Sequence, residues 1–294
     1  MGGMSHTQNP TRPQTTRDAV RPGLLRRLAA HWRGRPFGFA VGALAVLLGV
    51  MILLMPSAYV VETPGPTQDV LGESGGKKVI DVSGVPTHKD SGRLLLVTVN
   101  AAGVPGYPVS NAEALWGWAD PQMLVMPQEA IFPVGQTSEE YERESQQEMT
   151  SSQDAAVTAG LDYAGKLGAD VKGAKVTMHV DDIGGPSAGM MYALGLVDML
   201  TPAEESAGTT VAGTGTIDDK GKVGAIGGID LKMLGALRDG ATWFLAPSAN
   251  CDEVVGHVPE GLRDVKVSTL DDAYRALVAI GEGKGDALPR CTAG

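Results

Sequence analysis

Cysteine is scarce in this sequence, which contains only two among 294 residues. Cys251 and Cys291 form no C-x-x-C pattern and belong to no cluster of cysteine and histidine. Cysteine-based metal sites are recognised by such closely spaced ligands. A G-x-x-x-x-G-K-[S/T] phosphate-binding loop is also absent from the sequence, so no built-in ATPase is expected. We therefore predict no metal and no cofactor.

Positive charge is scarce outside the first 35 residues. That segment contains seven arginines and a single acid, Asp18, although the whole chain carries a net charge of −10. Nucleic-acid binding depends on lysine and arginine side chains that neutralise phosphates. The acidic remainder of the chain therefore argues against a nucleic-acid partner.

Charge of either sign is missing between Arg35 and Glu62, and residues 37–55 are all apolar or glycine. A helix needs about 20 such residues to cross the hydrocarbon core of a membrane. The sequence therefore predicts a transmembrane helix over residues 36–56. The alternative is a cleaved signal peptide, but its apolar region would be about 7–15 residues long and would end in an A-x-A-like site.

The residues that flank this segment predict its orientation. Trp32 and Tyr59 lie where interfacial aromatic residues are usual, the arginines precede the segment and acidic residues follow it. The positive-inside rule then puts the N-terminus in the cytoplasm. The expected organisation is a disordered, basic cytoplasmic tail (1–35), the membrane helix, an extracytoplasmic segment with short strands (57–136) and a C-terminal domain (137–294). The lipid bilayer is thus a predicted partner.

The two cysteines agree with this orientation. Both lie in the exported part of the chain, where a disulfide can form and persist. A bridge between Cys251 and Cys291 would close a loop of about 40 residues and contribute about 3–4 kcal/mol in the chain-entropy model. Two unpaired, buried cysteines are the alternative.

Local patterns predict a mixture of strands and helices, and we expect one compact α/β or α+β domain from residue 171 onward. Thr137 and Glu140 form a capping box that begins a helix running to about residue 167, as one helix or two. Gly240 is expected to end another helix, and Ser268 with Asp271 to cap the last one. The expected strands are 78–82, 93–100, 123–126, 174–180, 210–217, 222–226, 242–246 and 265–267, and further helices are expected at 190–200 and 229–238.

Residues 184–195, GGPSAGMMYALG, contain the most informative serine. Gly185-Pro186-Ser187-Ala188-Gly189 fits the G-x-S-x-G pattern of a nucleophile that follows a strand and precedes a helix. Taken alone, the pattern is weak, because serine is also a preferred helix cap. A catalytic triad would need His257, the single histidine that follows Ser187, and the acid Asp252 lies too close to it in sequence.

Lysine is the other base available to Ser187. Lys232 interrupts a mostly apolar helix, and its neighbours Gly235 and Ala236 leave room for another backbone to approach and exclude water. Removal from water lowers the pKa of a lysine, so that the neutral amine can accept a serine proton. Ser187 at the start of a buried helix would also have free N–H groups that suit an oxyanion. A solvated helix lysine is the alternative interpretation.

The two motifs together resemble those of Lon-type proteases. The resemblance covers about residues 145–280 and rests on segments 180–189, 213–217, 221–232 and 240–247. It implies an α+β Lon-like fold, Ser187 as nucleophile and Lys232 as its general base. It also implies that the Thr214 hydroxyl orients the lysine amine and that Gly185, Pro186 and Ala188 support the site.

With its single anchor, the chain is most similar to membrane-anchored, Lon-like bacterial proteases that carry no ATPase. Those relatives usually contain a PDZ domain, for which Leu167 to Lys175 leaves no room. Gly184 also stands where Lon-type motifs often have an acid. The resemblance implies a hexameric ring and polypeptide substrates.

We therefore predict a membrane-anchored, ATP-independent serine endopeptidase that acts on unfolded or envelope-associated polypeptides. The alternative is an inactive Lon-like scaffold that binds envelope proteins without cutting them. A serine-histidine enzyme that uses His257 is a third possibility.

Overall fold

The computed structural model describes residues 37–133, 135–180 and 184–292. The chain divides into two compact units, Met1–Ile52 and Leu53–Gly294. Helix α2 (Phe37–Leu54) has a mean hydropathy of 2.7 and no buried residue. Among the described residues it is the one helix long and apolar enough to cross a membrane, and a membrane anchor and a signal sequence both fit that description. The predicted cytoplasmic tail lies outside the described residues.

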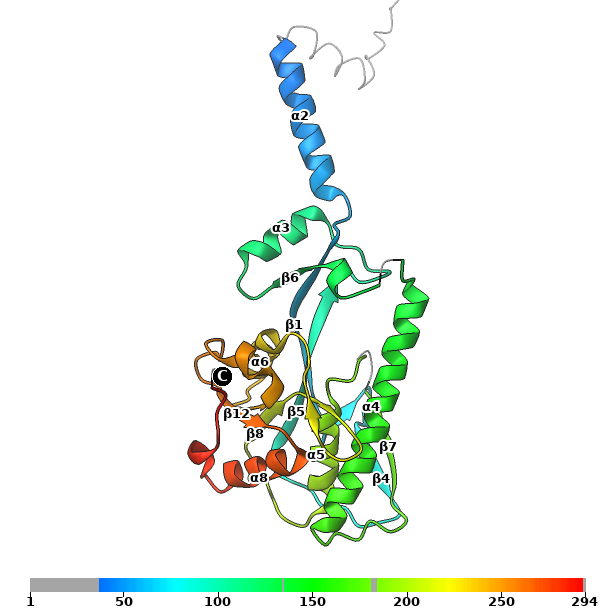
Figure 1. The fold of residues 1–294 in the computed structure, drawn as a ribbon, viewed down its shortest axis with the longest axis vertical. Coiled ribbons are helices and arrows are strands. Elements are labelled where there is room, and N and C mark those ends of the chain that lie inside the picture. Colours follow the sequence, from blue (N-terminus) through cyan, green and yellow to red (C-terminus); the bar gives the residue numbers. More distant parts are fainter. Residues whose placement is uncertain (1–36, 134, 181–183, 293–294) are drawn as a thin grey trace, which may run out of the picture. The chain divides into compact units, whose positions relative to one another are not determined.

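The second unit is built on a six-stranded sheet with the strand order β12-β11-β8-β5-β1-β6 (Figure 1). Strands β5, β8, β11 and β12 are parallel, whereas β1 is antiparallel to both β5 and β6. Strands from residues 57–136 thus share one sheet with strands from the second half of the chain. The strands are β1 (Tyr59–Asp69), β5 (Arg93–Ala102), β6 (Leu124–Pro127), β8 (Thr210–Gly213), β11 (Trp243–Pro247) and β12 (Arg263–Val267).

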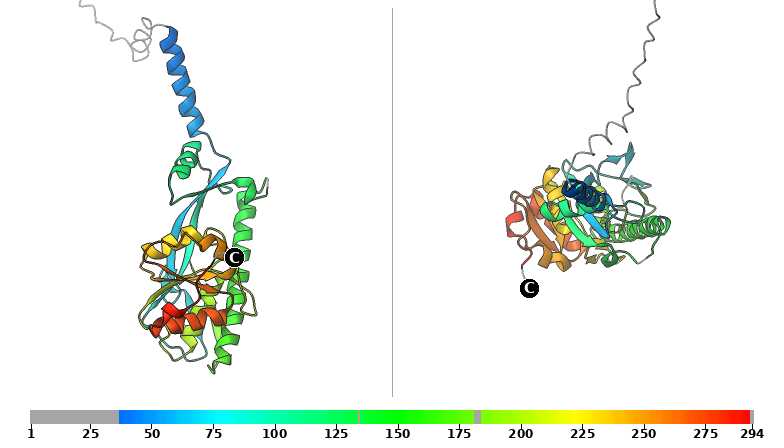
Figure 2. Two further views of the ribbon diagram at one scale, coloured as in Figure 1. Left: turned by 60° about the vertical axis from the view of Figure 1, so that its left-hand side comes forward. Right: turned by 90° about the horizontal axis from the view of Figure 1, so that it is seen from above.

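Helices cover both faces of this sheet, because alternate strand residues point to opposite sides. Leu94 and Leu96 pack in the core that includes α5 and α8, while Leu95 and Val97 pack in a second core with α6. Figure 2 shows the helices around the sheet from two further sides. The helices are α3 (Asn111–Ala119), α4 (Ser138–Lys166), α5 (Gly189–Leu200), α6 (Ile229–Arg238), α7 (Cys251–Val254) and α8 (Leu270–Gly281).

Short elements complete the unit as three antiparallel strand pairs and three 3-10 turns. The strand pairs are β2 (Glu73–Ser74) with β3 (Lys77–Lys78), β4 (Ile80–Ser83) with β7 (Lys175–Met178), and β9 (Thr216–Ile217) with β10 (Val223–Gly224). The turns are η1 (Gln128–Ala130), η2 (Ser248–Asn250) and η3 (Gly285–Ala287). The fold is therefore a mixed α/β arrangement.

Local capping signals predict several helix ends correctly. Thr137 accepts a hydrogen bond from the Glu140 N–H, and the Glu140 side chain bonds back to Thr137, so the predicted capping box begins α4. This helix is continuous over 29 residues rather than split in two. Gly240 follows α6 with a φ of +91°, in the left-handed conformation that favours glycine after a helix.

Two predictions about local structure are wrong. Helix α8 is capped by Thr269 and Asp272, one residue later than the predicted Ser268 and Asp271. The predicted strand 210–217 is broken between Gly213 and Thr216, since β8 joins the main sheet whereas β9 pairs with β10. Strand β1 and helix α3 were not expected from the sequence.

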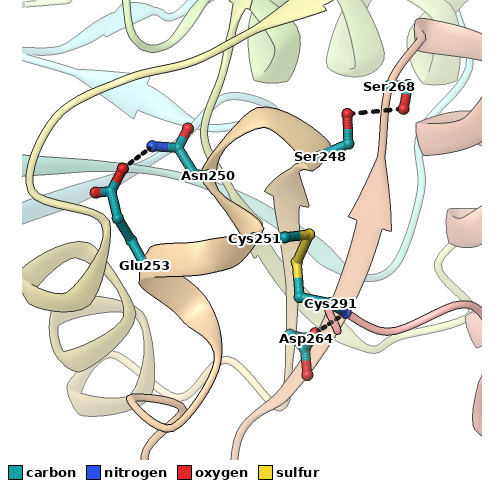
Figure 3. Close-up of a disulfide and its surroundings, with 7 residues drawn as sticks. All are labelled: Ser248, Asn250, Cys251, Glu253, Asp264, Ser268 and Cys291. Atoms are coloured by element: carbon teal, nitrogen blue, oxygen red, sulfur yellow. Dashed lines mark hydrogen bonds between the residues drawn. A yellow bond between two sulfur atoms is a disulfide. The ribbon is translucent and has the colours of Figure 1, made fainter. Parts of the chain in front are cut away.

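The predicted disulfide between Cys251 and Cys291 is confirmed, with a Cα–Cα distance of 4.9 Å (Figure 3). It joins the start of α7 to the segment near the C-terminus. The Asp264 carboxylate on β12 accepts a hydrogen bond of 2.7 Å from the Cys291 N–H. The bridge and this hydrogen bond hold the C-terminal segment against the edge of the sheet.

Candidate active site

Ser187 lies in the turn before α5 and does not cap that helix. The N-cap position is occupied by Ala188, where no side chain accepts a capping hydrogen bond. Gly185 has a φ of +81°, a left-handed conformation that favours glycine. Ala188 is buried, and its small side chain packs in the core beside α5. The structure thus leaves the Ser187 hydroxyl without a role in capping.

Neighbouring elements hold the backbone of this turn. The Ser187 carbonyl accepts hydrogen bonds from the Thr214 hydroxyl at 3.0 Å and from the Gly215 N–H at 2.8 Å. The Pro186 carbonyl accepts a hydrogen bond of 3.0 Å from the Ser152 hydroxyl on α4. The position of Ser187 is therefore fixed from two sides, by the loop after β8 and by α4.

Thr214 is completely buried at the break between β8 and β9. Its hydroxyl proton is directed to the Ser187 carbonyl, a contact that the sequence did not predict. The predicted contact between Thr214 and the amine of Lys232 stays a prediction. The observed bond makes Thr214 a residue that positions the serine turn.

Lys232 is a buried lysine on α6, with only 3 % of its surface exposed. The helix packs against β1 and β5, where Gly235 approaches the backbone of β1. A Cβ atom added at Gly235 would lie 3.4 Å from the Gly65 carbonyl oxygen. The small residue next to Lys232 therefore does allow another backbone to come close, as its position in the sequence predicted.

Burial lowers the pKa of Lys232 from 10.5 to about 8 because the charged amine loses its contact with water. The negative charge of Glu62 on β1 acts in the opposite direction and raises that pKa. Burial also raises the pKa of Glu62 itself, which Lys232 lowers and Asp230 raises. A substantial share of Lys232 is consequently neutral at slightly alkaline pH.

Ser187 and Lys232 line the same pocket, which has a volume of about 130 Å³. One wall comes from an irregularity in the pairing of β1 with β5, between Pro64 and Thr67. The complete lining consists of Pro66, Thr98, Val99, Asn100, Gly184, Ser187 and Lys232. A hydroxyl nucleophile and an amine of lowered pKa in one pocket are the two groups that a serine-lysine mechanism requires.

The helix N-terminus beside this pocket offers fewer free N–H groups than the sequence suggested. The Gly189 N–H donates to the Pro186 carbonyl at 3.3 Å, and the Met190 N–H donates to the Gly215 carbonyl at 3.0 Å. Both donors are therefore already occupied. Electrostatic stabilisation of an oxyanion would depend on the positive end of the α5 dipole and on other N–H groups of the turn.

Gly184 lies at the edge of the pocket against α4. A Cβ atom added at this position would come within 2.2 Å of the Ser145 hydroxyl oxygen. An acidic side chain at position 184 would therefore require Ser145 to adopt another rotamer. Contact with α4 gives a physical reason for the glycine that stands where related motifs often have an acid.

His257 is not among the residues that line the pocket. Its side chain is exposed, and Nδ1 lies 2.9 Å from the Glu253 carbonyl oxygen. Lys232 lines the same pocket as Ser187, whereas His257 is not among the lining residues. The geometry therefore favours lysine as the base.

Sequence reasoning missed Glu62 as an electrostatic partner of Lys232. The two residues are far apart in the chain, and Glu62 is the one charged residue in the otherwise uncharged stretch between Arg35 and Asp69. Its interruption of that stretch is the signal that could have pointed to it. Asn100, which also lines the pocket, has no comparable signal in the sequence.

Comparison with known proteins agrees with this geometry. Residues 139–279 match the family model of the Lon protease (S16) C-terminal proteolytic domain. A Lon protease of Xanthomonas oryzae pv. oryzae is 36 % identical over 126 residues, which cover 40 % of this chain and 15 % of the relative. Lon protease 1 of Bacillus subtilis is 39 % identical over 103 residues, or 34 % of this chain and 13 % of the relative.

A Lon protease of Clostridioides difficile is 37 % identical over 102 residues, covering 33 % of this chain and 13 % of the relative. The match thus spans only 13–15 % of the length of these three curated relatives. Residues 139–279 therefore match a Lon-type C-terminal proteolytic domain, and such a domain suggests serine peptidase activity.

Proposed function

Because residues 139–279 match a Lon-type proteolytic domain, we propose that the protein is a membrane-anchored, ATP-independent serine endopeptidase. Ser187 is the proposed nucleophile and Lys232 its general base. The observation that carries this proposal is the shared pocket of Ser187 and a buried lysine whose pKa falls to about 8. Unfolded or envelope-associated polypeptides are the proposed substrates.

In the proposed mechanism, the Ser187 oxygen attacks the carbonyl carbon of a peptide bond, and the neutral Lys232 amine takes up the serine proton. The tetrahedral intermediate then collapses to an ester on Ser187. The C–N bond breaks, and Lys232 returns the proton to the leaving amine. A water molecule hydrolyses the ester through the same proton transfers in reverse and releases the second product.

The surroundings of Lys232 support this role. A lysine of ordinary pKa would be almost fully protonated at pH 7 and could not accept a proton. Burial of Lys232 on α6 raises the neutral fraction, and Lys232 lines the same pocket as Ser187. Thr214 contributes by fixing the serine turn through its bond to the Ser187 carbonyl.

The proposal is tested with the purified full-length protein in detergent, with a permanently unfolded polypeptide as substrate and no ATP. We expect cleavage by the wild type. We also expect a loss of at least about a thousandfold in Ser187→Ala and loss of cleavage in Lys232→Ala, because a nucleophile and its base act as one unit. The exposed residue His257 provides the control, and His257→Ala is expected to retain activity.

Two results would contradict this proposal. Activity lost in His257→Ala but kept in Lys232→Ala would establish a serine-histidine enzyme. Absence of cleavage by the wild type with every unfolded substrate would favour the alternative of a Lon-like scaffold that binds polypeptides.

Two observations support the membrane anchor of the proposal. Helix α2 has the length and hydropathy of a membrane span. The residue that follows it, Met55, accepts a hydrogen bond of 3.0 Å from the Asn111 N–H at the start of α3. Helix α3 exposes Leu115, Trp116 and Trp118, and tryptophan is enriched at membrane interfaces.

We propose that the N-terminus lies in the cytoplasm and that residues 57–294 lie outside. A membrane-impermeant protease added to intact cells should then digest a C-terminal tag and spare an N-terminal one. The opposite pattern would reverse the proposed orientation. Release of the protein from membranes by alkaline carbonate would instead contradict the anchor.

A six-membered ring is the proposed assembly. Lon proteases are typically oligomeric, and resemblance to them is the basis for a six-membered ring. Light scattering on the detergent-solubilised protein, corrected for bound detergent, tests it. A monomer at micromolar concentration would contradict the ring without affecting the proposed chemistry.

A further inference from the structure

Three acids gather at the C-terminal end of α5, the end opposite Ser187. Oxygen atoms of Asp90, Asp198 and Glu205 all lie within 4.8 Å of one another. Asp90 belongs to the loop before β5, Asp198 to the last turn of α5 and Glu205 to the loop before β8. Within the described residues this is the one group of acids, histidines and cysteines arranged closely enough to share a metal ion.

Two of these acids are buried without a full set of partners. Asp198 and Glu205 each have 2 % of their surface exposed. Neither oxygen of the Asp198 carboxyl group receives a hydrogen bond from an N–H or hydroxyl donor, and neither does Oε2 of Glu205. The side chains with which Asp198 can share a hydrogen bond are the acids Asp90 and Glu205. A buried carboxylate without partners is strongly unfavourable. The free oxygens therefore point to a missing positive charge.

The other oxygens of the cluster are held in place by the fold. Glu205 Oε1 accepts hydrogen bonds from the hydroxyls of Thr201 and Tyr274, which leaves Oε2 free. The Asp90 carboxylate accepts bonds of 2.8 and 2.6 Å from the N–H and hydroxyl of Ser206. These contacts fix the direction of two of the three carboxyl groups.

The electrostatic surroundings favour a cation at this position. The charged groups that act on Asp198 are the acids Asp90 and Glu205, with no lysine, arginine or histidine among them. Burial, followed by these two acids, raises the pKa of Asp198 to about 9. Asp198 also lies near the negative end of the α5 dipole, which disfavours an anion and attracts a cation.

We propose that Asp90, Asp198 and Glu205 form a binding site for a hard divalent cation of the size of Ca²⁺. Carboxylate oxygens are the preferred ligands of Ca²⁺, at about 2.3–2.6 Å, and two ligands on opposite sides of the ion are then about 4.8 Å apart. Asp90 is only half-buried, so the cluster has an edge toward solvent through which the ion enters.

A cation at this site would connect three segments that are distant in the sequence. It would hold the C-terminal end of α5 to the loops that lead into β5 and β8. Those two strands are adjacent in the sheet, and β8 continues to Thr214 beneath the serine turn. The site is thus structural, and its main effect is on stability rather than on the chemistry at Ser187.

The test measures the melting temperature of the full-length protein in detergent with EDTA, CaCl₂ or MgCl₂. At a Ca²⁺ concentration of 100 times Kd, we expect the melting temperature to rise by about 5–10 °C. Mg²⁺ should give a smaller rise, because it requires shorter bonds and gives up its water reluctantly. The melting temperature does not depend on proteolytic activity.

Asp198→Asn is the decisive variant, because it keeps the shape of the side chain and removes its charge. We expect it to abolish the Ca²⁺-induced rise and to melt at a higher temperature than the wild type in EDTA. The exposed hairpin residue Asp219 provides the matched control, since Asp219→Asn should keep the full rise.

Binding is measured directly with Tb³⁺, whose luminescence is excited through a nearby tyrosine such as Tyr274, the donor to Glu205. We expect a signal in the wild type that Ca²⁺ displaces and that Asp198→Asn lacks. A wild-type melting temperature unchanged by Ca²⁺ would overturn the site. A rise that persists in Asp198→Asn would assign the ion to another position.

Discussion

The two ends of α5 hold ionisable groups that burial drives toward opposite uncharged forms. Beside the N-terminal end, burial lowers the pKa of Lys232 to about 8 and favours the neutral amine. At the C-terminal end, burial raises the pKa of Asp198 to about 9 and favours the neutral acid. The same cause, loss of contact with water, thus acts on a base and on an acid.

The surroundings of Lys232 and Asp198 suit these two buried groups to different chemical roles. Lys232 opens to a pocket with Ser187 and has the negative charge of Glu62 nearby. Asp198 lies among acids, and its oxygens receive no hydrogen bond from an N–H or hydroxyl donor. A buried group beside a nucleophile and an open pocket is suited to proton transfer, whereas a buried acid among acids is suited to binding a cation or a proton.

Among the variants that test the two ends of α5, the largest expected effect comes from Lys232→Met, which removes the base and fills its space with an apolar chain. Loss of a general base should lower kcat/KM by at least about a hundredfold. The same variant should be more stable at pH 7 by about 3 kcal/mol, since at that pH the wild type buries a charged amine whose pKa burial lowers from 10.5 to about 8.

The lowered pKa of Lys232 determines how its contribution to stability changes with pH. Between pH 8 and 10.5 the Lys232 amine is protonated in the unfolded chain but largely neutral in the folded protein. The contribution of Lys232 to the free energy of unfolding therefore rises with pH over this range, and burial of Lys232 is most costly below pH 8. Urea unfolding at pH 7 measures the difference, and the exposed residue Lys222 supplies the control variant Lys222→Met. A Lys232→Met protein that is active, or less stable than the wild type, would contradict the expected role.

A smaller effect is expected at the other end of α5. The folded protein binds a proton on Asp198 between pH 3.8 and about 9 that the unfolded chain releases, so in EDTA this group should lower stability as pH rises through that range. Asp198→Asn should remove this slope and gain at least about 2 kcal/mol at pH 8.

Urea unfolding in EDTA at pH 5 and pH 8 measures this effect. The difference between Asp198→Asn and the wild type should be larger at pH 8 than at pH 5. An equal difference at both pH values would mean that Asp198 is not the titrating group and would remove the contrast between the two ends of α5.

Glu62→Gln is expected to have a moderate effect on the pH dependence of catalysis. The Glu62 charge raises the pKa of Lys232, so its removal should lower that pKa and move the half-maximal kcat/KM to below about pH 8. The rate at pH 7 should then rise by a few-fold. Glu142→Gln, on the exposed face of α4, should leave the profile unchanged, and an upward shift in Glu62→Gln would refute the electrostatic role.

The smallest effect is expected from Gly184→Ala. The new Cβ meets the flexible Ser145 hydroxyl rather than backbone, so rotation of Ser145 should limit the loss of stability to less than about 1 kcal/mol. Activity should change by less than tenfold, and the double variant with Ser145→Ala should recover any loss. A large loss of activity that Ser145→Ala does not restore would mean that position 184 itself sets the geometry of Ser187.

Local signals in the sequence predicted many individual elements. The capping box of Thr137 and Glu140, the helix 229–238 and the left-handed Gly240 all occur as expected. The all-round apolar pattern of α5 correctly predicted a helix that is buried on nearly every side. These features depend on residues within one turn or one helix, and sequence patterns therefore contain them.

Predictions failed where a distant segment determined the local structure. The stretch 210–217 has the composition of one strand, but β8 pairs with β5 and β11, and β9 pairs with β10. Strand β1 was missed because its irregular pattern did not reveal that it pairs with β5 and β6. Helix α3 was missed although it begins at a local capping box of Ser110 and Glu113.

The sequence by itself determined the apolar segment 37–55, the serine turn, a lysine flanked by small residues and two cysteines that could form a single bridge. Only the tertiary structure decided that Glu62 faces Lys232, that Thr214 bonds to the Ser187 carbonyl and that Asp90 meets Asp198 and Glu205. The physical reason is that burial and Coulomb interaction depend on distance in space. The sheet brings residues more than 100 positions apart into contact, and no local pattern records that distance.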